Sequence, residues 1–223
     1  MLPTKKSELA GSFVVLTPEG QNYIFTVGVL CLIRQWDLET GECVQSYPLE
    51  TPETGGSENK RIQFCSLDPT NFYLLVAFQG GLVQVNDIYT GQTLYNKVAT
   101  EALNLDQEVT NVKWLGSQSS QWFICTCWEG QVAFFSQPVT LKGRQFLTCK
   151  KVNSLHRRDV LTLDITQKMN LVTGSVDNII CFWKMFDFTI SKDISLPFAA
   201  EGNQISHLCF PDPNMNELLL VFM

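Results

Sequence analysis

The sequence predicts an all-β protein assembled from a repeated, four-stranded antiparallel sheet. Short runs rich in β-branched and aromatic residues alternate with turn signals, as in NYIFTVG, LCLIRQW and ECVQSY. Similar third runs (LIRQWD, LVQVND, QVAFFS and IICFWK) recur at about 50-residue intervals and place Trp36, Asn86, Phe135 and Trp183 at equivalent positions. One such sheet cannot bury both of its faces alone, so neighbouring copies must pack face to face.

The repeat divides the chain into four complete sheets and the first half of a fifth. The complete sheets are predicted over 13–47, 61–96, 109–152 and 156–196, and the incomplete one over 204–223. An incomplete arc leaves sheet faces and edges uncovered. We therefore expect the arc to be part of a larger ring, completed by another chain or segment.

Polar connections between the predicted sheets indicate where a partner binds. These connections join a fourth strand to the next first strand, at residues 50–60, 99–108 and 197–204. All three fall on one face of the predicted disc, the face that carries His156. Because elaborated loops often carry recognition, this face is the expected partner surface.

The most regular repeat contains four polar residues at fixed spacing. His156 precedes Asp177 by 21 positions, and Asp177 precedes Trp183 by six. The pattern predicts that Asp177 accepts from the His156 imidazole, and that the Ser175 hydroxyl joins this imidazole to the Trp183 indole N–H. We interpret all four residues as a buried structural network.

The same repeat invites a catalytic interpretation, which the sequence does not favour. A nucleophilic serine beside His156 and Asp177 needs exposure and an oxyanion hole, and the chain has no G-x-S-x-G elbow. A hydrolase built on such sheets would also need a cluster of ionisable residues at the central channel, and the sequence indicates none. We predict a protein that is not an enzyme and has no catalytic residues.

No cofactor, metal or small-molecule substrate is predicted. Cys125 and Cys127 form a C-x-C pair without a second pair at metal-ligand spacing, and His207 stands alone in an apolar run. The chain has no phosphate-binding glycine loop and no dinucleotide fingerprint. Trp114, Trp122 and Trp128 are interpreted as core or inter-sheet packing residues.

Charge and hydropathy restrict the expected partners. The net charge is −6, which argues against nucleic acid, and the apolar runs are too short to span a bilayer. The N-terminal stretch has no signal-peptide pattern, so we expect a cytoplasmic protein.

Every Lys, Arg, Asp or Glu between residues 142 and 158 is basic: Lys142, Arg144, Lys150, Lys151, Arg157 and Arg158. This segment is either an ordinary solvated face or a dock for an acidic protein surface.

The stretch from His156 to Trp183 resembles a WD repeat, and the Trp36-Asp37 pair resembles the dipeptide that names that family. The resemblance implies a β-propeller whose sheets are blades, and a scaffold without catalysis that binds other proteins. The chain departs from the pattern where Lys184 replaces the aspartate after Trp183. Leu30 occupies the turn-aspartate position of the first blade, and the first three blades lack the four-residue network.

A narrower resemblance covers residues 61–184. The ordered segments SLDPTN, TGQTL, EVTNVKWLG, CWEGQVAFF, HRRDVLTLDI and LVTGSVDNIICFW resemble large axonemal WD-repeat proteins of motile cilia. This implies a cytoskeletal protein of the cilium or flagellum that binds axonemal microtubules or spoke-base complexes, with the basic segment on acidic tubulin. The alternative is a nucleolar WD-repeat scaffold of small-subunit ribosome assembly, which DLETGECVQSY fits and the acidic net charge disfavours.

Overall fold

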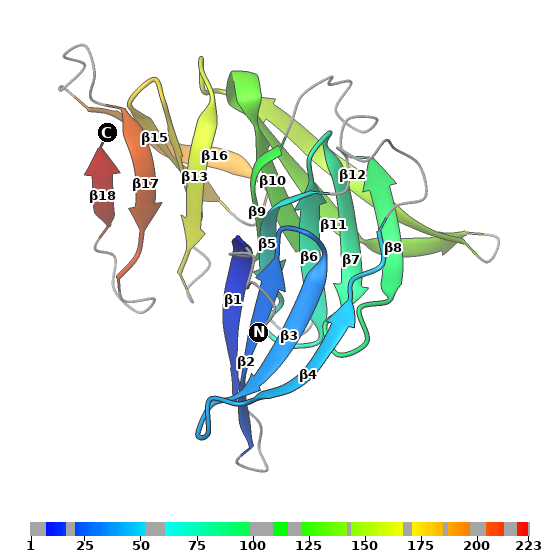
Figure 1. The fold of residues 1–223 in the computed structure, drawn as a ribbon. Helices are drawn as coiled ribbons and strands as arrows, with labels where there is room; N and C mark the ends of the chain where they lie inside the picture. Colours follow the sequence, from blue (N-terminus) through cyan, green and yellow to red (C-terminus); the bar gives the residue numbers. More distant parts are fainter. Residues whose placement is uncertain are drawn as a thin grey trace.

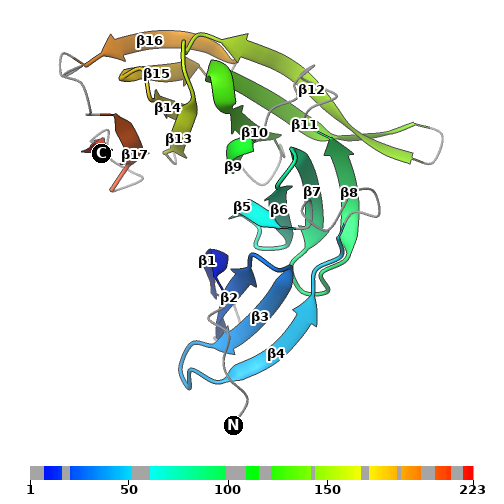
Figure 2. The same ribbon diagram turned by 45° about the horizontal axis from the view of Figure 1, so that its top comes forward.

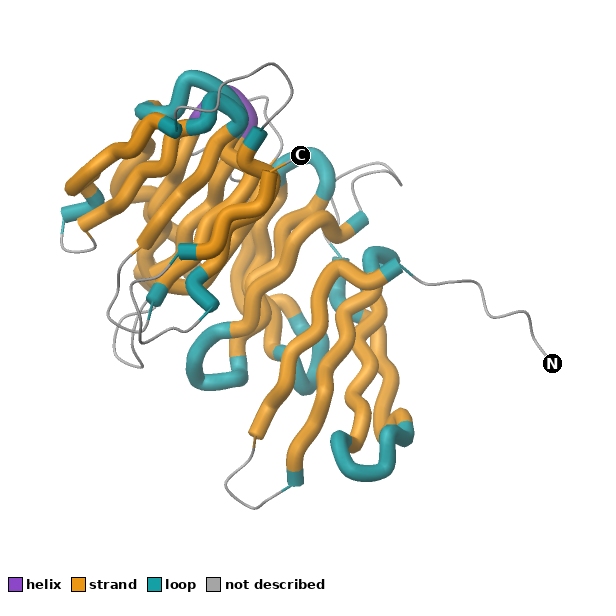
Figure 3. The backbone as a smooth tube through the Cα atoms, turned by 90° about the vertical axis from the view of Figure 1, so that its left-hand side faces the viewer, coloured by secondary structure: helices purple, strands orange, loops and turns teal. Residues whose placement is uncertain are grey.

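The computed structural model is an all-β propeller arc, which confirms the predicted fold class (Figure 1). It describes residues 8–16, 21–51, 61–98, 109–115, 122–141, 144–166, 171–184, 187–196, 204–211 and 218–222. Within these ranges, no helix is long and apolar enough to cross a membrane. The helical structure described there is one short 3-10 turn, Trp128–Gly130 (Figure 3).

Five antiparallel sheets, here called blades 1 to 5, follow one another along the chain. Blade 1 contains β1 (Leu9–Leu16), β2 (Asn22–Gly28), β3 (Leu32–Asp37) and β4 (Cys43–Pro48). Blade 2 contains β5 (Ile62–Leu67), β6 (Tyr73–Phe78), β7 (Leu82–Asp87) and β8 (Thr93–Val98). Blade 3 contains β9 (Val109–Leu115), β10 (Trp122–Cys127), β11 (Gln131–Leu141) and β12 (Arg144–Ser154). Blade 4 contains β13 (Val160–Ile165), β14 (Leu171–Ser175), β15 (Ile179–Lys184) and β16 (Thr189–Ser195), and blade 5 contains β17 (Ile205–Cys209) and β18 (Leu219–Phe222).

Each blade runs outward from the centre of the arc. The first strands, β1, β5, β9 and β13, lie on its inner side, and the fourth strands, β4, β8, β12 and β16, form its outer rim (Figure 2). Successive strands are hydrogen-bonded neighbours, so every blade is an up-and-down meander. The arc is open between blade 5 and blade 1 in this view.

A register shift recurs in the first hairpin of every blade. It lies between Leu9 and Gly11 in blade 1 and between Val160 and Thr162 in blade 4, where one strand carries an extra residue. Blades 2, 3 and 5 have the corresponding shift at Ile62/Phe64, Thr126/Cys127 and Ile205/His207. In blade 1 this bulged pairing extends the first strand back to Leu9, four residues before the predicted start at residue 13.

The hydrophobic core is divided among the interfaces between blades. Phe25 and Val27 of blade 1 share a buried cluster with Leu74 and Val76 of blade 2, and comparable clusters join each later pair of blades. Between blades 3 and 4, the Phe134 and Trp183 rings meet edge to face with centroids 5.4 Å apart. Stability of one blade therefore depends on its neighbours.

The turn after the third strand is fixed by an aspartate in blades 1 and 2. The Asp37 carboxylate accepts from the backbone N–H groups of Glu39 and Thr40, and Asp87 makes the same bonds to Tyr89 and Thr90. These are the two D-x-x-T-G stretches of the sequence. The side chain thus holds a tight turn that starts the outer strand.

Candidate interaction face and the network beneath it

In a buried network of blade 4, the Thr173 hydroxyl joins the Trp183 indole to the His156 imidazole. The Trp183 Nε1–H donates to Thr173 Oγ1 over 2.9 Å, and His156 Nε2 lies 2.8 Å from the same oxygen. The imidazole Nδ1 faces Asp177 Oδ1 at 3.8 Å, on the opposite side of the ring. Asp177 lies in the turn between β14 and β15, whereas Trp183 lies near the other end of β15, opposite Leu171.

The prediction that Ser175 links His156 to Trp183 is wrong. The Ser175 hydroxyl donates to the backbone oxygen of Arg158 over 3.1 Å and accepts from the Asp177 N–H over 3.2 Å. The strand register explains the difference, because Trp183 lies opposite Leu171, two residues from Thr173 but four from Ser175. At about 3.3 Å per residue, Ser175 is roughly 13 Å from that point, beyond the reach of an indole.

Asp177 anchors the loop that carries His156. Its Oδ2 accepts from the Arg157 N–H over 2.7 Å, and its Oδ1 accepts from the Ile179 N–H over 2.9 Å. Burial acts to raise the pKa of Asp177, but His156 and these backbone donors outweigh it and lower the pKa to about 2. The carboxylate is therefore ionised wherever the blade is folded at neutral pH.

These contacts are incompatible with a Ser/His/Asp catalytic triad. Ser175 is fully buried and its hydroxyl is directed to Arg158, while the Thr173 hydroxyl occupies the position beside the His156 imidazole. A nucleophile would need to be exposed and bonded to its base. Structural satisfaction of buried polar groups accounts for all four residues.

Part of the same network recurs in blade 1. The Trp36 Nε1–H donates to Thr26 Oγ1 over 2.9 Å, and Thr26 precedes Trp36 by ten residues, as Thr173 precedes Trp183. In blade 2 the equivalent Asn86 instead donates to Thr93 Oγ1 over 3.1 Å. The indole–hydroxyl half of the network thus persists where the histidine and the turn aspartate are absent.

Second and fourth strands end at the same edge of each blade. The turns between second and third strands therefore lie on the same face of the arc as the interblade loops, and we call this face the loop face. Three exposed apolar residues follow such strands: Leu30, Trp128 and Leu155. Trp128 was predicted to be a packing residue, but it is 42% exposed because it lies in the turn after β10 rather than in the strand. Trp114 and Trp122 lie in strands, and Trp114 is buried as predicted.

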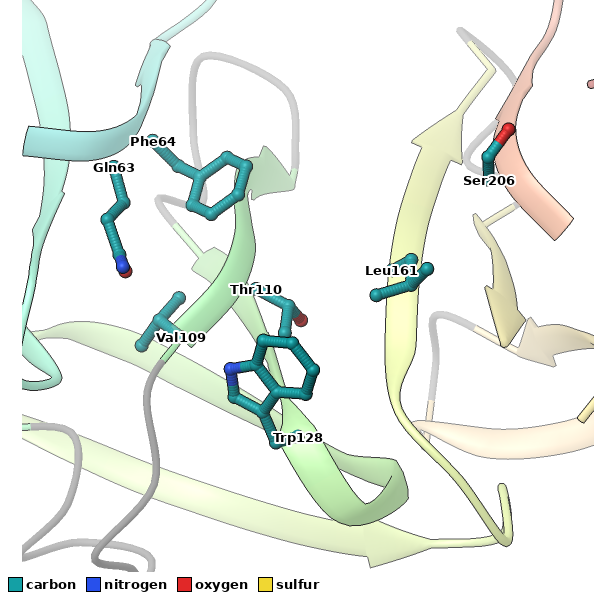
Figure 4. Close-up of a pocket in the computed structure, with 7 residues that line it drawn as sticks. All are labelled: Gln63, Phe64, Val109, Thr110, Trp128, Leu161 and Ser206. Carbon is teal, nitrogen blue, oxygen red and sulfur yellow. The ribbon is translucent and has the colours of Figure 1, made fainter. Parts of the chain in front are cut away.

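A cavity of about 450 Å³ opens at the centre of the arc, with the Trp128 indole at its middle (Figure 4). Its walls come from the inner strands of four blades and from the Trp128 turn. The lining residues are Gln63, Phe64, Val109, Thr110, Trp128, Leu161 and Ser206. The lining is mostly apolar, and none of these side chains is ionisable.

The Trp128 turn is held against the loop that precedes blade 4. The Glu129 N–H donates to Asp159 Oδ1 over 2.9 Å. Gly130 has a φ of +79°, and a Cβ there would come within 2.0 Å of the His156 carbonyl oxygen. Only glycine permits this approach, so the exposed indole and the His156 loop form one fixed unit across two blades.

The structure describes only part of the predicted basic segment, which stays a prediction. Lys142 lies outside the described residues, and for Arg144, Lys150 and Lys151 the structure describes the backbone of β12 without the side chains. Arg144 and Lys151 are seven residues apart on that strand, roughly 23 Å at 3.3 Å per residue. Arg157 and Arg158 are exposed on the loop face. The basic segment therefore follows the outer edge of blade 3 toward that face.

All three polar connections predicted to bind a partner, 50–60, 99–108 and 197–204, lie wholly or almost wholly outside the described residues. The described parts are Glu50 and Thr51 of the first connection and Gln204 of the third. Glu50 accepts from the Thr93 N–H over 2.6 Å and so ties the start of its loop to blade 2. The predicted recognition by these loops stays a prediction.

The cysteines and His207 show no arrangement for metal binding in the part of the chain that the structure describes. No group of three or more His, Cys, Asp or Glu side chains is close enough there to hold an ion. Cys125 and Cys127 are buried, and burial raises the pKa of Cys127 to about 12. His207 is exposed on blade 5.

Comparison with known proteins supports the repeat assignment. A "WD repeat-containing protein on Y chromosome" from Drosophila mojavensis is 25% identical over 166 residues, covering 73% of this chain and 13% of the relative. Its counterpart from Drosophila pseudoobscura pseudoobscura is 24% identical over 124 residues, covering 56% of this chain and 11% of the relative. The chain thus spans only a small part of these relatives. No protein-family model matches it.

A solved structure shares the fold. A chain of a crystal structure of the mitotic checkpoint complex superposes with a TM-score of 0.66 at 14% identity, covering 98% of this chain and 58% of that one. The similarity extends over all five blades and not over an isolated sheet. Together with the repeated blades and the Thr173–Trp183 network, these comparisons support a β-propeller built from WD repeats.

Proposed function

We propose that the chain is a non-catalytic scaffold that binds proteins, and that it works in the ciliary axoneme on microtubules or spoke-base complexes. WD-repeat homology and the propeller fold support a protein-interaction scaffold. The axonemal setting rests on the ordered segments between residues 61 and 184 that resemble large axonemal WD-repeat proteins. The partner surface proposed is the loop face together with the outer edge of blade 3.

The observation that carries the microtubule proposal is the basic outer strand of blade 3. β11 and β12 are each 11 residues long, whereas every other described strand has eight residues or fewer, and their hairpin projects past the neighbouring blade (Figure 2). Arg144, Lys150 and Lys151 lie along β12, and Arg157 and Arg158 follow it. Basic residues spread along and after a projecting strand suit an extended acidic surface such as tubulin.

The loop face supplies the apolar part of the proposed interaction. Trp128 lies at the central cavity, and the exposed Leu30 and Leu155 lie on the same face. Interface hot spots are enriched in tryptophan near the centre of a contact. We therefore expect Trp128 to contribute binding energy, and the basic strand to contribute association rate and salt dependence.

Co-sedimentation with polymerised microtubules tests the proposal. We expect binding that weakens as salt rises from about 50 to 200 mM, and at least a tenfold loss of affinity when Lys150, Lys151, Arg157 and Arg158 are all changed to Glu. Reversing Lys192, an exposed residue on blade 4, is the matched control. Unchanged binding by the fourfold variant would reject the basic strand as the tubulin contact.

Fractionation of ciliated cells tests the setting. Isolated cilia are extracted with detergent and then with high salt, and the tagged protein is followed by immunoblot. Retention in the axonemal pellet is the expected result. A nucleolar signal without any in cilia would reject the axonemal proposal and favour the alternative, a scaffold of small-subunit ribosome assembly.

A further inference from the structure

Phe72 is a large aromatic side chain left exposed on the face opposite the loop face. It directly precedes β6 and is 56% exposed, although blade 2 packs against both blade 1 and blade 3. In blade 1 the same position holds Asn22, whose carbonyl oxygen accepts from the Leu38 N–H as that of Phe72 accepts from the Ile88 N–H. The turn geometry therefore does not require a phenyl ring at this position.

The Phe72 ring is the outer member of a row of aromatic side chains that runs into the core. Its centroid lies 5.7 Å from that of Tyr89, and Tyr89 meets Phe25 edge to face at 5.5 Å. Phe25 is fully buried between blades 1 and 2. Contact with Tyr89 therefore supports the Phe72 ring on one side, while more than half of the side chain stays open to solvent.

A buried carboxylate fixes the backbone of this turn. Asp68 is 2% exposed, and its Oδ1 accepts from the Phe72 and Tyr73 N–H groups over 2.8 and 2.7 Å. Its Oδ2 accepts from the backbone N–H and the hydroxyl of Thr70. All of these donors are neutral, so the negative charge beneath Phe72 is hydrogen-bonded without being cancelled by a cation among these partners.

A second carboxylate adds to the negative potential beside the rings. Asp87 accepts from the backbone N–H of Tyr89 over 2.7 Å. Burial raises the pKa of Tyr89, and the nearby charges of Asp87 and Asp68 raise it further. The two turns that carry these residues, 68–72 and 87–92, contain no lysine, arginine or histidine. The exposed ring therefore lies in a region of negative charge.

We infer that this aromatic–acidic patch, Phe72 with Tyr89, Asp68 and Asp87, binds a lysine or arginine side chain in a basic segment of a partner protein. An open phenyl ring attracts a cation placed within about 6 Å of its centroid, and adjacent carboxylates strengthen that attraction. The same carboxylates would repel an acidic partner, and a purely apolar partner would not use them.

The aromatic–acidic patch is separate from the proposed microtubule contact. It belongs to blade 2 and lies on the face opposite Trp128, and its charge is opposite to that of the basic segment. A scaffold with one surface for an acidic partner and another for a basic partner can hold the two in one complex. The inference does not rest on microtubule binding.

Fluorescence anisotropy with a fluorescein-labelled peptide of alternating Arg and Gly tests the inference. The wild-type chain should bind it with a dissociation constant below about 1 mM at about 50 mM salt, and should not bind the corresponding peptide of Glu and Gly. Phe72→Leu keeps an apolar side chain and every charge but removes the ring, so it should weaken binding about two- to fivefold. Phe72→Tyr keeps the ring and should bind as the wild type does. Trp128→Leu, at an exposed indole on the loop face, is the matched control and should change nothing.

A second pair of variants tests the charge. Asp87→Asn keeps a side chain that can accept from the turn but removes one negative charge, and should weaken binding about two- to fivefold. Glu42→Gln removes one negative charge at an exposed position of blade 1 and should leave binding unchanged. Equal losses for the two variants would mean attraction by net charge alone and would reject the patch.

Two further outcomes would overturn the inference. Equal binding by the wild type and Phe72→Leu would do so, as would no binding of the Arg peptide up to about 1 mM. Self-association of the wild-type chain in sedimentation velocity, abolished by Phe72→Leu, would assign the patch to a second copy and would also overturn it. Phe72→Leu should co-sediment with microtubules as the wild type does, which shows that the variant is folded and separates this inference from the proposed function.

Discussion

Thr173 Oγ1 lies 2.9 Å from Trp183 Nε1, and this single hydroxyl also meets the His156 imidazole at 2.8 Å. Blade 4 therefore depends on one small side chain to satisfy two buried nitrogen atoms. Trp183 belongs to a buried apolar cluster that includes Leu163, Leu171 and Cys181, so a lost hydrogen bond there is costly.

Thr173→Val should lower the free energy of unfolding by about 2 to 3 kcal/mol, because it keeps the side-chain shape but leaves two buried nitrogens without a partner. Thr173→Ser keeps the hydroxyl and should lose less than about 1.5 kcal/mol. Urea denaturation followed by tryptophan fluorescence measures both. Equal losses for the two variants would contradict the role of the hydroxyl.

Ser175→Ala should cost less than Thr173→Val. It removes a donor to the Arg158 carbonyl and an acceptor for the Asp177 N–H, each a single backbone bond, so we expect about 1 kcal/mol. The indole environment of Trp183 should stay unchanged in near-ultraviolet circular dichroism. A larger effect than that of Thr173→Val would restore the sequence-based assignment of Ser175.

Asp177 should make blade 4 sensitive to acid. Its pKa is lowered to about 2 in the fold, from 3.8 when unperturbed, so its stabilisation is complete above about pH 4 and is lost as the pH falls toward 2. Asp177→Asn should cost about 1 to 2 kcal/mol at pH 7, after allowance for solvent screening. The gap between wild type and variant should close by pH 2 in thermal melts. A constant gap at all pH values would show that ionisation is not involved.

Gly91 and Gly41 form a matched pair that isolates a steric contact between blades. Both have positive φ, +73° and +70°, but a Cβ on Gly91 would come within 2.4 Å of the Pro48 carbonyl oxygen, whereas nothing lies within 4 Å of one on Gly41. Gly41→Ala should cost about 1 kcal/mol from backbone strain alone, and Gly91→Ala at least about 3 kcal/mol. Similar melting temperatures for the two variants would show that blades 1 and 2 separate easily.

The blades and their order follow from sequence because turn chemistry and period-two runs are local signals. The identity of the network hydroxyl does not, because Thr173 and Ser175 are two residues apart and face the same side of one strand. Only the pairing register distinguishes them. One sequence signal was available, since Thr26 precedes Trp36 by the same ten residues as Thr173 precedes Trp183. The exposure of Trp128 depends on the turn geometry after β10, which its apolar neighbours do not reveal.

Asp164 joins three consecutive blades through one carboxylate. It forms an ion pair with Lys113 of blade 3, and its Oδ2 accepts from the Phe210 N–H of blade 5 over 2.8 Å. Lys113 and Asp164 occupy the same register position in their blades, opposite Ile124 and Val172. The carboxylate is therefore a candidate for the coupling of blade 5 to the rest of the arc.

Asp164→Asn should weaken that coupling more than it weakens the whole fold. The amide removes the negative charge beside Lys113 and can supply only one accepting oxygen, so we expect a loss of about 2 to 3 kcal/mol. Amide hydrogen exchange in β17 should accelerate by at least about tenfold, while exchange in blades 1 and 2 stays the same. The control is Asp193→Asn at an exposed position of blade 4. Uniform acceleration in all blades would show that Asp164 stabilises the arc as a whole and does not specifically hold blade 5.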